Sequence, residues 1–333
     1  MRQTIFSGIQ PSGNPHLGNY LGAIRNWVSL QDSYNTIYSI VDLHSLTVRQ
    51  DPAELRVNCR NLFTLLIACG LDPKKNIIYY QSNVRAHAQL AWILSCYTYF
   101  GELNRQVQFK EKSNKHEENV NAGLFTYPVL QAADILLFGS HLVPVGEDQR
   151  QHLELSRDVA IRFNNIYGDI FVVPKAHIAK TGARVMSLSD PERKMSKSDL
   201  TGDNGIIYLQ DDDDTIVNKF KKAVTDSFNK VVYGADRPGV SNLMTIYSAF
   251  TGKTVEETEA EFEGVGYGTF KKAVAEAVIE ILSPIRKEYK CLSDDKSYID
   301  DLLKKHTERA NSLAEETLNK VEDAIGLQKG CIL

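Results

Sequence analysis

A glycine-rich loop close to the start of the sequence has the composition of a phosphate-binding turn. Three glycines lie between residues 8 and 18, after a strand-like stretch at residues 3–7 and before a helical pattern that begins at Asn19. Such a loop can bind phosphate, because unpaired backbone N–H groups and the helix dipole point at one spot. Gly18 would let the backbone approach the ligand, and His16 and Asn19 could donate hydrogen bonds to phosphate or ribose. A purely structural turn would look the same.

A second stretch, Lys194-Met195-Ser196-Lys197-Ser198, is basic and rich in hydroxyl groups. Two lysines separated by small side chains suit a mobile clamp that neutralises a polyphosphate as negative charge builds on it. A solvated basic linker between two domains would have the same composition. The stretch therefore indicates a function only together with the glycine-rich loop.

The two stretches, in this order, resemble the paired signature sequences of the class I aminoacyl-tRNA synthetases. Pro15-His16-Leu17-Gly18-Asn19 resembles the first signature, with asparagine where the commonest form has a second histidine, and residues 194–198 match the second. The pair is more specific than either motif alone. Other stretches narrow the resemblance to the tryptophanyl-tRNA synthetases of the bacterial and organellar type: residues 6–13, 41–44, 108–112, 127–136, 143–149, 182–188, 223–227 and 239–243.

This resemblance, which covers nearly the whole chain, implies activation of L-tryptophan by ATP to tryptophanyl-adenylate and pyrophosphate. Transfer of tryptophan to the 3′-terminal ribose of tRNA(Trp) would follow. The substrate carboxylate is already ionised at neutral pH, so the first step needs no enzymic base. The protein must instead align that carboxylate with the α-phosphate and stabilise the departing pyrophosphate. The glycines, the helix N-terminus, His16 and the lysines suit that task.

The same resemblance implies an ATP site built from both signatures and the stretch around residue 147. The catalytic residues would be His16, Lys194, Lys197 and Lys112, the last reaching in from its own loop. The implied ATP-binding residues are Gln10, Pro11, Ser12, Gly18, Asn19, Gly146, Glu147, Asp148, Val185, Lys194, Met195, Ser196, Lys197 and Ser198.

The resemblance also implies a tryptophan pocket. Tyr127 and Gln149 would bind the substrate amino group, and Asp134 would accept the indole N–H. The walls of the pocket would be Phe6, His44, Val143 and Val145.

Two of these side chains have a second interpretation. Asp134 lies in an apolar helical stretch, where a charge is costly unless a donor binds it. A salt-bridged structural aspartate would satisfy the same requirement, because buried acids are usually paired. His44 could equally be a core histidine. Gln131 stands where many bacterial relatives carry methionine, so a polar group there could alter the amino-group contacts or face another way.

The first half of the sequence predicts the framework for this site. Strand-like runs at residues 3–7, 36–41, 76–81 and 142–145 alternate with helical patterns, which is typical of a parallel sheet covered by helices. We expect a Rossmann-like α/β catalytic domain over residues 1–200, with ATP at the carboxyl ends of the strands. The helical patterns lie at residues 19–31, 52–69, 87–103, 124–138 and 152–167.

After residue 200 the pattern becomes mostly helical. By the resemblance, residues 201–292 would form a helical domain that reads the tRNA anticodon, and residues 293–333 a C-terminal helix that packs back on the catalytic domain. Thr254 with Glu257, and Ser297 with Asp300, have the spacing of capping boxes, and Gly326 could end the last helix. The aspartate run at residues 211–214 favours a helix start over a metal site.

Composition limits the partners of the chain. Its 333 residues predict about two domains, and 38 Lys+Arg against 42 Asp+Glu give a net charge of -4. The chain as a whole is therefore not basic enough to bind a nucleic acid by overall charge alone. Residues 1–200 carry 21 basic and 18 acidic side chains, a charge of +3, and the remaining 17 and 24 give -7. Five cysteines without CxxC spacing favour a reducing compartment.

Further expectations concern partners and location. We expect tRNA(Trp), L-tryptophan, ATP and a second copy of the chain as partners, with Mg²⁺ arriving with ATP and no resident metal. We expect neither a membrane nor a DNA partner, and a cytoplasmic location, or the mitochondrial matrix for a processed organellar enzyme. Three alternatives stay open: a tyrosyl-tRNA synthetase, a small-molecule nucleotidylyltransferase, and a catalytically inactive tRNA-binding relative.

Overall fold

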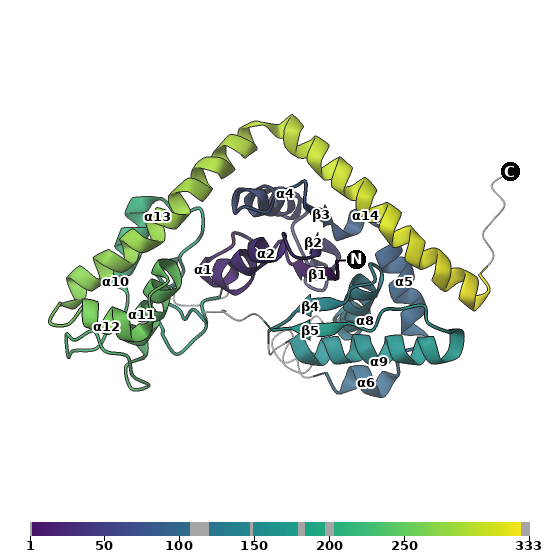
Figure 1. Ribbon diagram of the computed structural model, residues 1–333, viewed down its shortest axis with the longest axis horizontal. Helices are drawn as coiled ribbons and strands as arrows, with labels where there is room; N and C mark the ends of the chain where they lie inside the picture. Colours follow the sequence, from purple (N-terminus) through teal and green to yellow (C-terminus); the bar gives the residue numbers. More distant parts are fainter. Residues whose placement is uncertain (1, 107–119, 147–148, 179–183, 197–202, 328–333) are drawn as a thin grey trace.

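A parallel sheet lies at the centre of the computed structural model, which describes residues 2–106, 120–146, 149–178, 184–196 and 203–327. The strand order is β3-β2-β1-β4-β5, and all described pairs are parallel (Figure 1). In such a doubly wound sheet the order reverses between β1 and β4, and ligands bind beside that point at the carboxyl ends of the strands. This confirms the expected Rossmann-like α/β fold. The strands are β1 (Thr4–Ile9), β2 (Asn35–Ile40), β3 (Asn76–Tyr80), β4 (Leu142–Pro144) and β5 (Lys175–His177).

Both faces of the sheet are apolar. Successive side chains of a strand point to opposite faces. On β3, Ile78 belongs to one hydrophobic core, whereas Ile77 and Tyr79 belong to the other. On β2, Tyr38 belongs to the same core as Ile78, and Ile37 belongs to the other core. Because both faces are buried, these strands appear in the sequence as nearly continuous hydrophobic runs.

Helices cover each face of the sheet (Figure 1). In the first half of the chain, the helices that share the first core with the sheet are α1 (Leu17–Asn19), the π-helical turn η1 (Tyr20–Ile24), α2 (Arg25–Leu30) and α4 (Pro52–Ala68). The second core joins the opposite face to α5 (Ala86–Ser95), α8 (Ala122–Leu136) and α9 (Arg150–Tyr167). Three short helices, α3 (Asp42–Ser45), η2 (Gln81–Asn83) and α6 (Phe100–Asn104), follow β2, β3 and α5.

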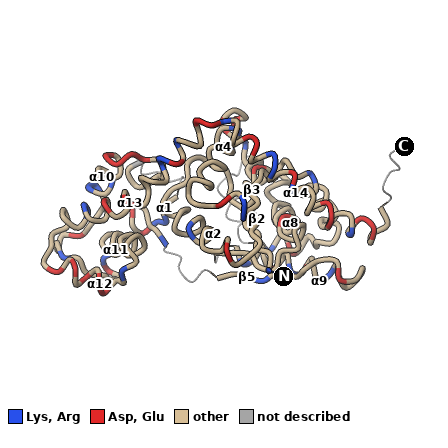
Figure 2. Tube along the Cα trace, turned by 45° about the horizontal axis from the view of Figure 1, so that its top comes forward, with Lys and Arg blue, Asp and Glu red and all other residues tan. Residues whose placement is uncertain are grey.

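The described residues from 203 onward form mainly helices. The elements are η5 (Asp203–Gly205), α10 (Asp213–Lys222), α11 (Pro238–Thr251), α12 (Val255–Glu261), α13 (Tyr267–Asp294) and α14 (Lys296–Ile325). Helices α13 and α14 meet at an apex, and α14 runs back beside β3 and α5 (Figure 1). Acidic and basic residues are interspersed along both helices (Figure 2).

Helix α14 covers the free edge of β3. The backbone N–H of Ile78 donates to Nδ1 of His306, which is buried on α14. An edge strand that is covered in this way cannot pair with a foreign strand. Among the described residues, no helix combines the length and the apolar character that crossing a membrane would require.

Two helix boundaries differ from the sequence prediction. The helix expected at residues 87–103 is split into α5 and α6, because the backbone N–H of Tyr99 donates to Glu102 and starts a new helix. The last helix begins at Lys296, where the Asp295 side chain accepts from the N–H of Tyr298. The capping box expected for Ser297 was therefore wrong.

Other local predictions are confirmed. Thr254 and Glu257 form the expected capping box, and Gly326 ends α14 in the left-handed conformation at φ 80°. Asp212 caps α10, as expected for the aspartate run. Strand β5 was missed, because three partly exposed residues give too short a pattern.

Candidate active site

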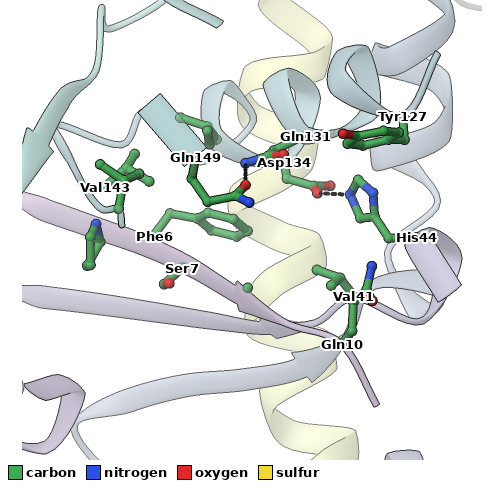
Figure 3. Close-up of a pocket in the computed structure, with 14 residues that line it drawn as sticks. Phe6, Ser7, Gln10, Val41, His44, Tyr127, Gln131, Asp134, Val143 and Gln149 are labelled. Carbon is green, nitrogen blue, oxygen red and sulfur yellow. Dashed lines mark hydrogen bonds and ion pairs between the residues drawn. The ribbon is translucent and has the colours of Figure 1, made fainter. Parts of the chain in front are cut away.

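A cavity of about 410 Å³ opens at the carboxyl end of β1, between the sheet and α8 (Figure 3). It lies where the strand order reverses, so the segments that follow β1 and β4 diverge and leave room for a ligand. Strand β1 contributes Ser7 and Gly8, and Val41 follows β2. All seven residues expected to bind tryptophan line this cavity: Phe6, His44, Tyr127, Asp134, Val143, Val145 and Gln149.

Helix α8 supplies the polar wall of this cavity. Tyr127, Gln131 and Asp134 follow one another at spacings of four and three residues, which places them on one helix face. Asn121 caps the helix by accepting the N–H of Leu124. The other positions of α8 are mostly apolar and pack in the second core, so the packing of the helix fixes which polar groups face the cavity.

Asp134 is both paired and exposed to the cavity, although only 1% of its surface is accessible. His44 Nε2 lies 2.8 Å from Oδ2 (Figure 3). Gln81 Nε2 donates to Oδ1 over 2.7 Å. His87 Nδ1 lies 2.6 Å from Oδ1. Burial alone would raise the pKa of this carboxyl, but His87 and His44 outweigh it and hold the pKa well below its ordinary value. Asp134 and His44 therefore pair with each other and also line the cavity, so a structural role and a ligand-binding role do not exclude each other for either residue.

The polar wall of the cavity also carries hydroxyl and amide groups. The Tyr127 hydroxyl lies 3.0 Å from Nε2 of His152, and burial raises the pKa of Tyr127, so the hydroxyl stays protonated. Gln131 Nε2 donates to Oε1 of Gln149 over 3.2 Å (Figure 3). Gln131 thus faces the cavity and contacts a residue expected to bind the amino group.

A second cavity of about 470 Å³ adjoins the first, and Gln10 lines both. Its remaining lining comes from the end of β1, the glycine-rich loop and both signature stretches: Ile9, Ser12, Pro15, His16, Gly18, Asn19, Lys194, Met195 and Ser196. His16 Nδ1 accepts the N–H of Gly18, and Asn19 Oδ1 accepts the N–H of His16. These reciprocal bonds form a capping box, so His16 and Asn19 stabilise the start of α1 and also line the cavity.

Backbone pairing attaches the second signature to this cavity. Met195 donates its N–H to the carbonyl of Val185, and Lys194 pairs with Met186 as an antiparallel bridge. The Met195 side chain is buried in the first core. This anchor leaves Lys194 exposed at the cavity.

Not all expected ATP-binding residues meet in this cavity. Pro11 and Val185 are buried, Gly146 is exposed, and none of the three lines either cavity. Lys112, Glu147, Asp148, Lys197 and Ser198 lie outside the described residues. The roles of all these residues stay predictions.

Three side chains at the site were not predicted from the sequence as ligands. Gln81 and His87 contact Asp134 from behind, and Gln131 contacts Gln149. His87 has no ligand-like spacing to another histidine, so sequence patterns alone gave no signal for it. Gln131 could have been found, because it stands one helical turn from both Tyr127 and Asp134. No group of three or more potential metal ligands occurs in the described part of the chain.

The fold and the two adjoining cavities define a nucleotide-binding α/β enzyme, and sequence comparison specifies which kind. The profile described as "tRNA synthetases class I (W and Y)" matches residues 1–283, so the chain belongs to this family.

Two curated relatives are both named tryptophan–tRNA ligase. The one from Caldanaerobacter subterraneus subsp. tengcongensis is 56% identical over 97% of this chain and 98% of its own length. The one from Clostridium tetani is 53% identical over 98% and 96%. The crystal structure of tryptophanyl-tRNA synthetase from Campylobacter jejuni, complexed with ADP and tryptophan, superposes with a TM-score of 0.84 at 34% identity. It covers 98% of this chain and 100% of its own.

Proposed function

We propose that this chain activates L-tryptophan with ATP and transfers it to tRNA(Trp), as a tryptophan–tRNA ligase. One observation carries the proposal. An apolar cavity with a buried, ionised acceptor adjoins a second cavity built from both synthetase signatures, and Gln10 lines the two. The relatives above 50% identity that bear this name support the choice of tryptophan within the family.

The proposed first step joins the tryptophan carboxylate to ATP. A carboxylate oxygen attacks the α-phosphorus, the bond to the bridging oxygen breaks, and pyrophosphate leaves with its electron pair. Because the nucleophile is already an anion, alignment and charge stabilisation are the tasks of the protein. In the second step a hydroxyl of the 3′-terminal ribose attacks the activated carbonyl, and AMP leaves.

In this proposal the second cavity holds ATP. His16, Gly18 and Asn19 would contact the nucleotide at the start of α1, and Lys194, with Lys197 and Lys112, would stabilise the charge that grows on the leaving pyrophosphate. Mg²⁺ would arrive with ATP, held by phosphate oxygens and water.

The first cavity would hold tryptophan. Phe6, Val143 and Val145 offer apolar walls, and Asp134 offers an acceptor for the indole N–H. Tyr127 and Gln149 also line the cavity and would offer an ammonium group a hydroxyl and an amide oxygen. The pocket therefore combines apolar walls with acceptors for an indole N–H and for an ammonium group, as tryptophan requires.

The helical half, residues 201–292, is proposed to read the anticodon, and residues 293–333 to anchor it to the sheet. A homodimer is also proposed. Trp92 and Phe100, each 74% exposed on α5 and α6, would form part of its interface, whereas Trp27 is buried in the core. The bacterial relatives favour a bacterial cytoplasm.

The decisive experiment is amino-acid-dependent exchange of radiolabelled pyrophosphate into ATP, with tryptophan and tyrosine at matched concentrations. We expect exchange with tryptophan alone. Exchange with tyrosine alone would make the chain a tyrosyl-tRNA synthetase. Exchange with neither would favour an inactive tRNA-binding relative or another adenylylation substrate.

A further inference from the structure

A histidine outside both cavities, His87, contacts Asp134 and has no role in the proposed reaction. His87 is completely buried on α5 and lines neither cavity. Its Nδ1 lies 2.6 Å from Oδ1 of Asp134, although the N–H direction is not that of a regular hydrogen bond. Its Nε2 lies 2.8 Å from the hydroxyl of Tyr79, and the two rings stack with centroids 5.8 Å apart. His87 thus links a fully buried tyrosine to the acceptor of the pocket.

The short contact determines where the imidazole carries its proton. The contact favours the tautomer with hydrogen on Nδ1 of His87, because the lone pair of an unprotonated nitrogen would repel a carboxylate oxygen 2.6 Å away. In the neutral ring Nε2 is then an acceptor, and Tyr79 donates its O–H to it. Burial raises the pKa of Tyr79 well above its ordinary value, so this hydroxyl keeps its proton. Tyr79 therefore favours the tautomer that faces Asp134 with a donor.

These contacts divide the two oxygens of Asp134 between different tasks. A carboxylate has about four acceptor positions, two on each oxygen. Oδ1 accepts a hydrogen bond from Gln81 and lies 2.6 Å from Nδ1 of His87, so both of its described neighbours belong to the protein. Oδ2 faces His44 alone among the described partners, which leaves one position for a ligand. The carboxylate is thereby arranged to accept one N–H donor from the cavity.

We propose that His87 is a positioning residue for substrate discrimination: with Tyr79 behind it, it fixes the Asp134 carboxylate so that Oδ2 accepts the indole N–H. This inference rests on the proposed function, because it assumes that tryptophan occupies the first cavity. It assigns His87 no contact with substrate. The carboxylate would rotate or share its acceptor positions differently without His87, and a substrate with an indole N–H would lose more than one without it.

The test compares L-tryptophan with its analogue in which sulfur replaces the indole N–H, using pyrophosphate exchange by the full chain. His87→Phe removes both ring nitrogens, and Tyr79→Phe removes only the hydroxyl that sets the tautomer. Leu90→Ala is the matched control, because Leu90 is a buried residue of the same helix that lines neither cavity. Thermal unfolding of each variant reports on folding.

We expect His87→Phe to lower kcat/KM for tryptophan about tenfold or more, and kcat/KM for the sulfur analogue by less than about threefold. Tyr79→Phe should reduce the preference for tryptophan in the same direction but less. Leu90→Ala should lower the melting temperature and leave the preference unchanged.

An unchanged preference in His87→Phe and Tyr79→Phe would overturn the proposal and leave His87 a purely structural residue. If His87→Phe fails to fold, the preference of Tyr79→Phe for tryptophan over the sulfur analogue decides: a reduced preference supports the proposal and an unchanged one overturns it. Failure of the proposed function is visible separately, because the unmodified chain would then not activate tryptophan at all.

Discussion

Asn242 holds both backbone groups of Met186: its Oδ1 accepts the N–H and its Nδ2 donates to the carbonyl, each over 2.9 Å. Asn242 lies on α11 in the helical half, and Met186 pairs with Lys194 of the second signature. The helical half thus sets the position of the segment that carries the lysine. The pairing is a direct connection between the two parts of the chain.

Replacing this connection should slow adenylate formation. Asn242→Ala would remove the partner of both backbone groups of the half-buried Met186 and loosen the segment at residues 185–195. We expect the rate of pyrophosphate exchange to fall about tenfold, with little change in tryptophan binding measured by fluorescence. Asn218→Ala, an exposed position on α10, is the control. Equal losses in rate and binding would contradict this expectation.

The lysines of the second signature should act on the transition state. Lys194→Ala, and Lys197→Ala outside the described residues, should lower the activation rate about a hundredfold and affect tryptophan affinity far less. Arg193→Ala removes a neighbouring charge that pairs with Asp190 and does not line the cavity. An equal loss of activation rate in Arg193→Ala would mean that the overall positive charge of this segment, and not the position of the lysines, determines the rate. Single-turnover kinetics would separate these cases.

Gly18 should tolerate no side chain. A Cβ atom there would lie 2.9 Å from Cε1 and 3.0 Å from Nδ1 of His16, and it would displace the imidazole from the capping box. Gly22 in the adjoining turn has open space at the same position. We expect Gly18→Ala to lower kcat/KM for ATP about tenfold or more, while Gly22→Ala retains activity. Comparable activity in the two variants would remove His16 from the ATP site.

Asp134→Asn should reduce the preference for tryptophan. The amide would place an N–H₂ group among the donors of His44, Gln81 and His87, and the indole N–H would lose its charged acceptor. We expect kcat/KM for tryptophan to fall about a hundredfold or more, and the ratio to the sulfur analogue to fall with it. Asp32→Asn, an exposed acid paired with Lys75, serves as control. Unchanged selectivity would exclude Asp134 from indole recognition.

His306 should make the stability of the fold depend on pH. Burial and the nearby Arg309 lower the pKa of His306 below 6.5, and its Nδ1 must stay unprotonated to accept the N–H of Ile78. Between the lowered pKa and 6.5 the unfolded chain binds more protons, so stability falls as pH falls below about 6.5. The slope from this group is at most about 1.4 kcal/mol per pH unit.

Urea unfolding at pH 7.5 and 5.5 checks this dependence. His306→Gln should be less stable at pH 7.5, because the edge contact is altered, but its stability should change less between the two pH values. An identical change in the original chain and the variant would show that other groups cause the dependence.

The sequence determined the elements and the chemistry of the site. Four strands appeared as β-branched, apolar runs, and helices appeared by their periodic pattern, with a start signal at Thr254 and an end signal at Gly326, because these signals depend on neighbouring residues. The two signatures indicated nucleotide chemistry, since the glycine spacing and the paired lysines are local patterns. All seven residues assigned to the tryptophan pocket by resemblance line one cavity.

Only the tertiary structure decided how these groups are paired. It brought His87 and Gln81 to Asp134, Gln131 to Gln149 and Asn242 to Met186, and it laid His306 along the edge of β3. Apart from the pair Gln131 and Gln149, whose first member stood out as an unusual residue, none of these contacts left a trace in spacing or composition. The reason is physical: burial determines which polar groups must find a partner, and the packing of distant elements determines which partner each one finds.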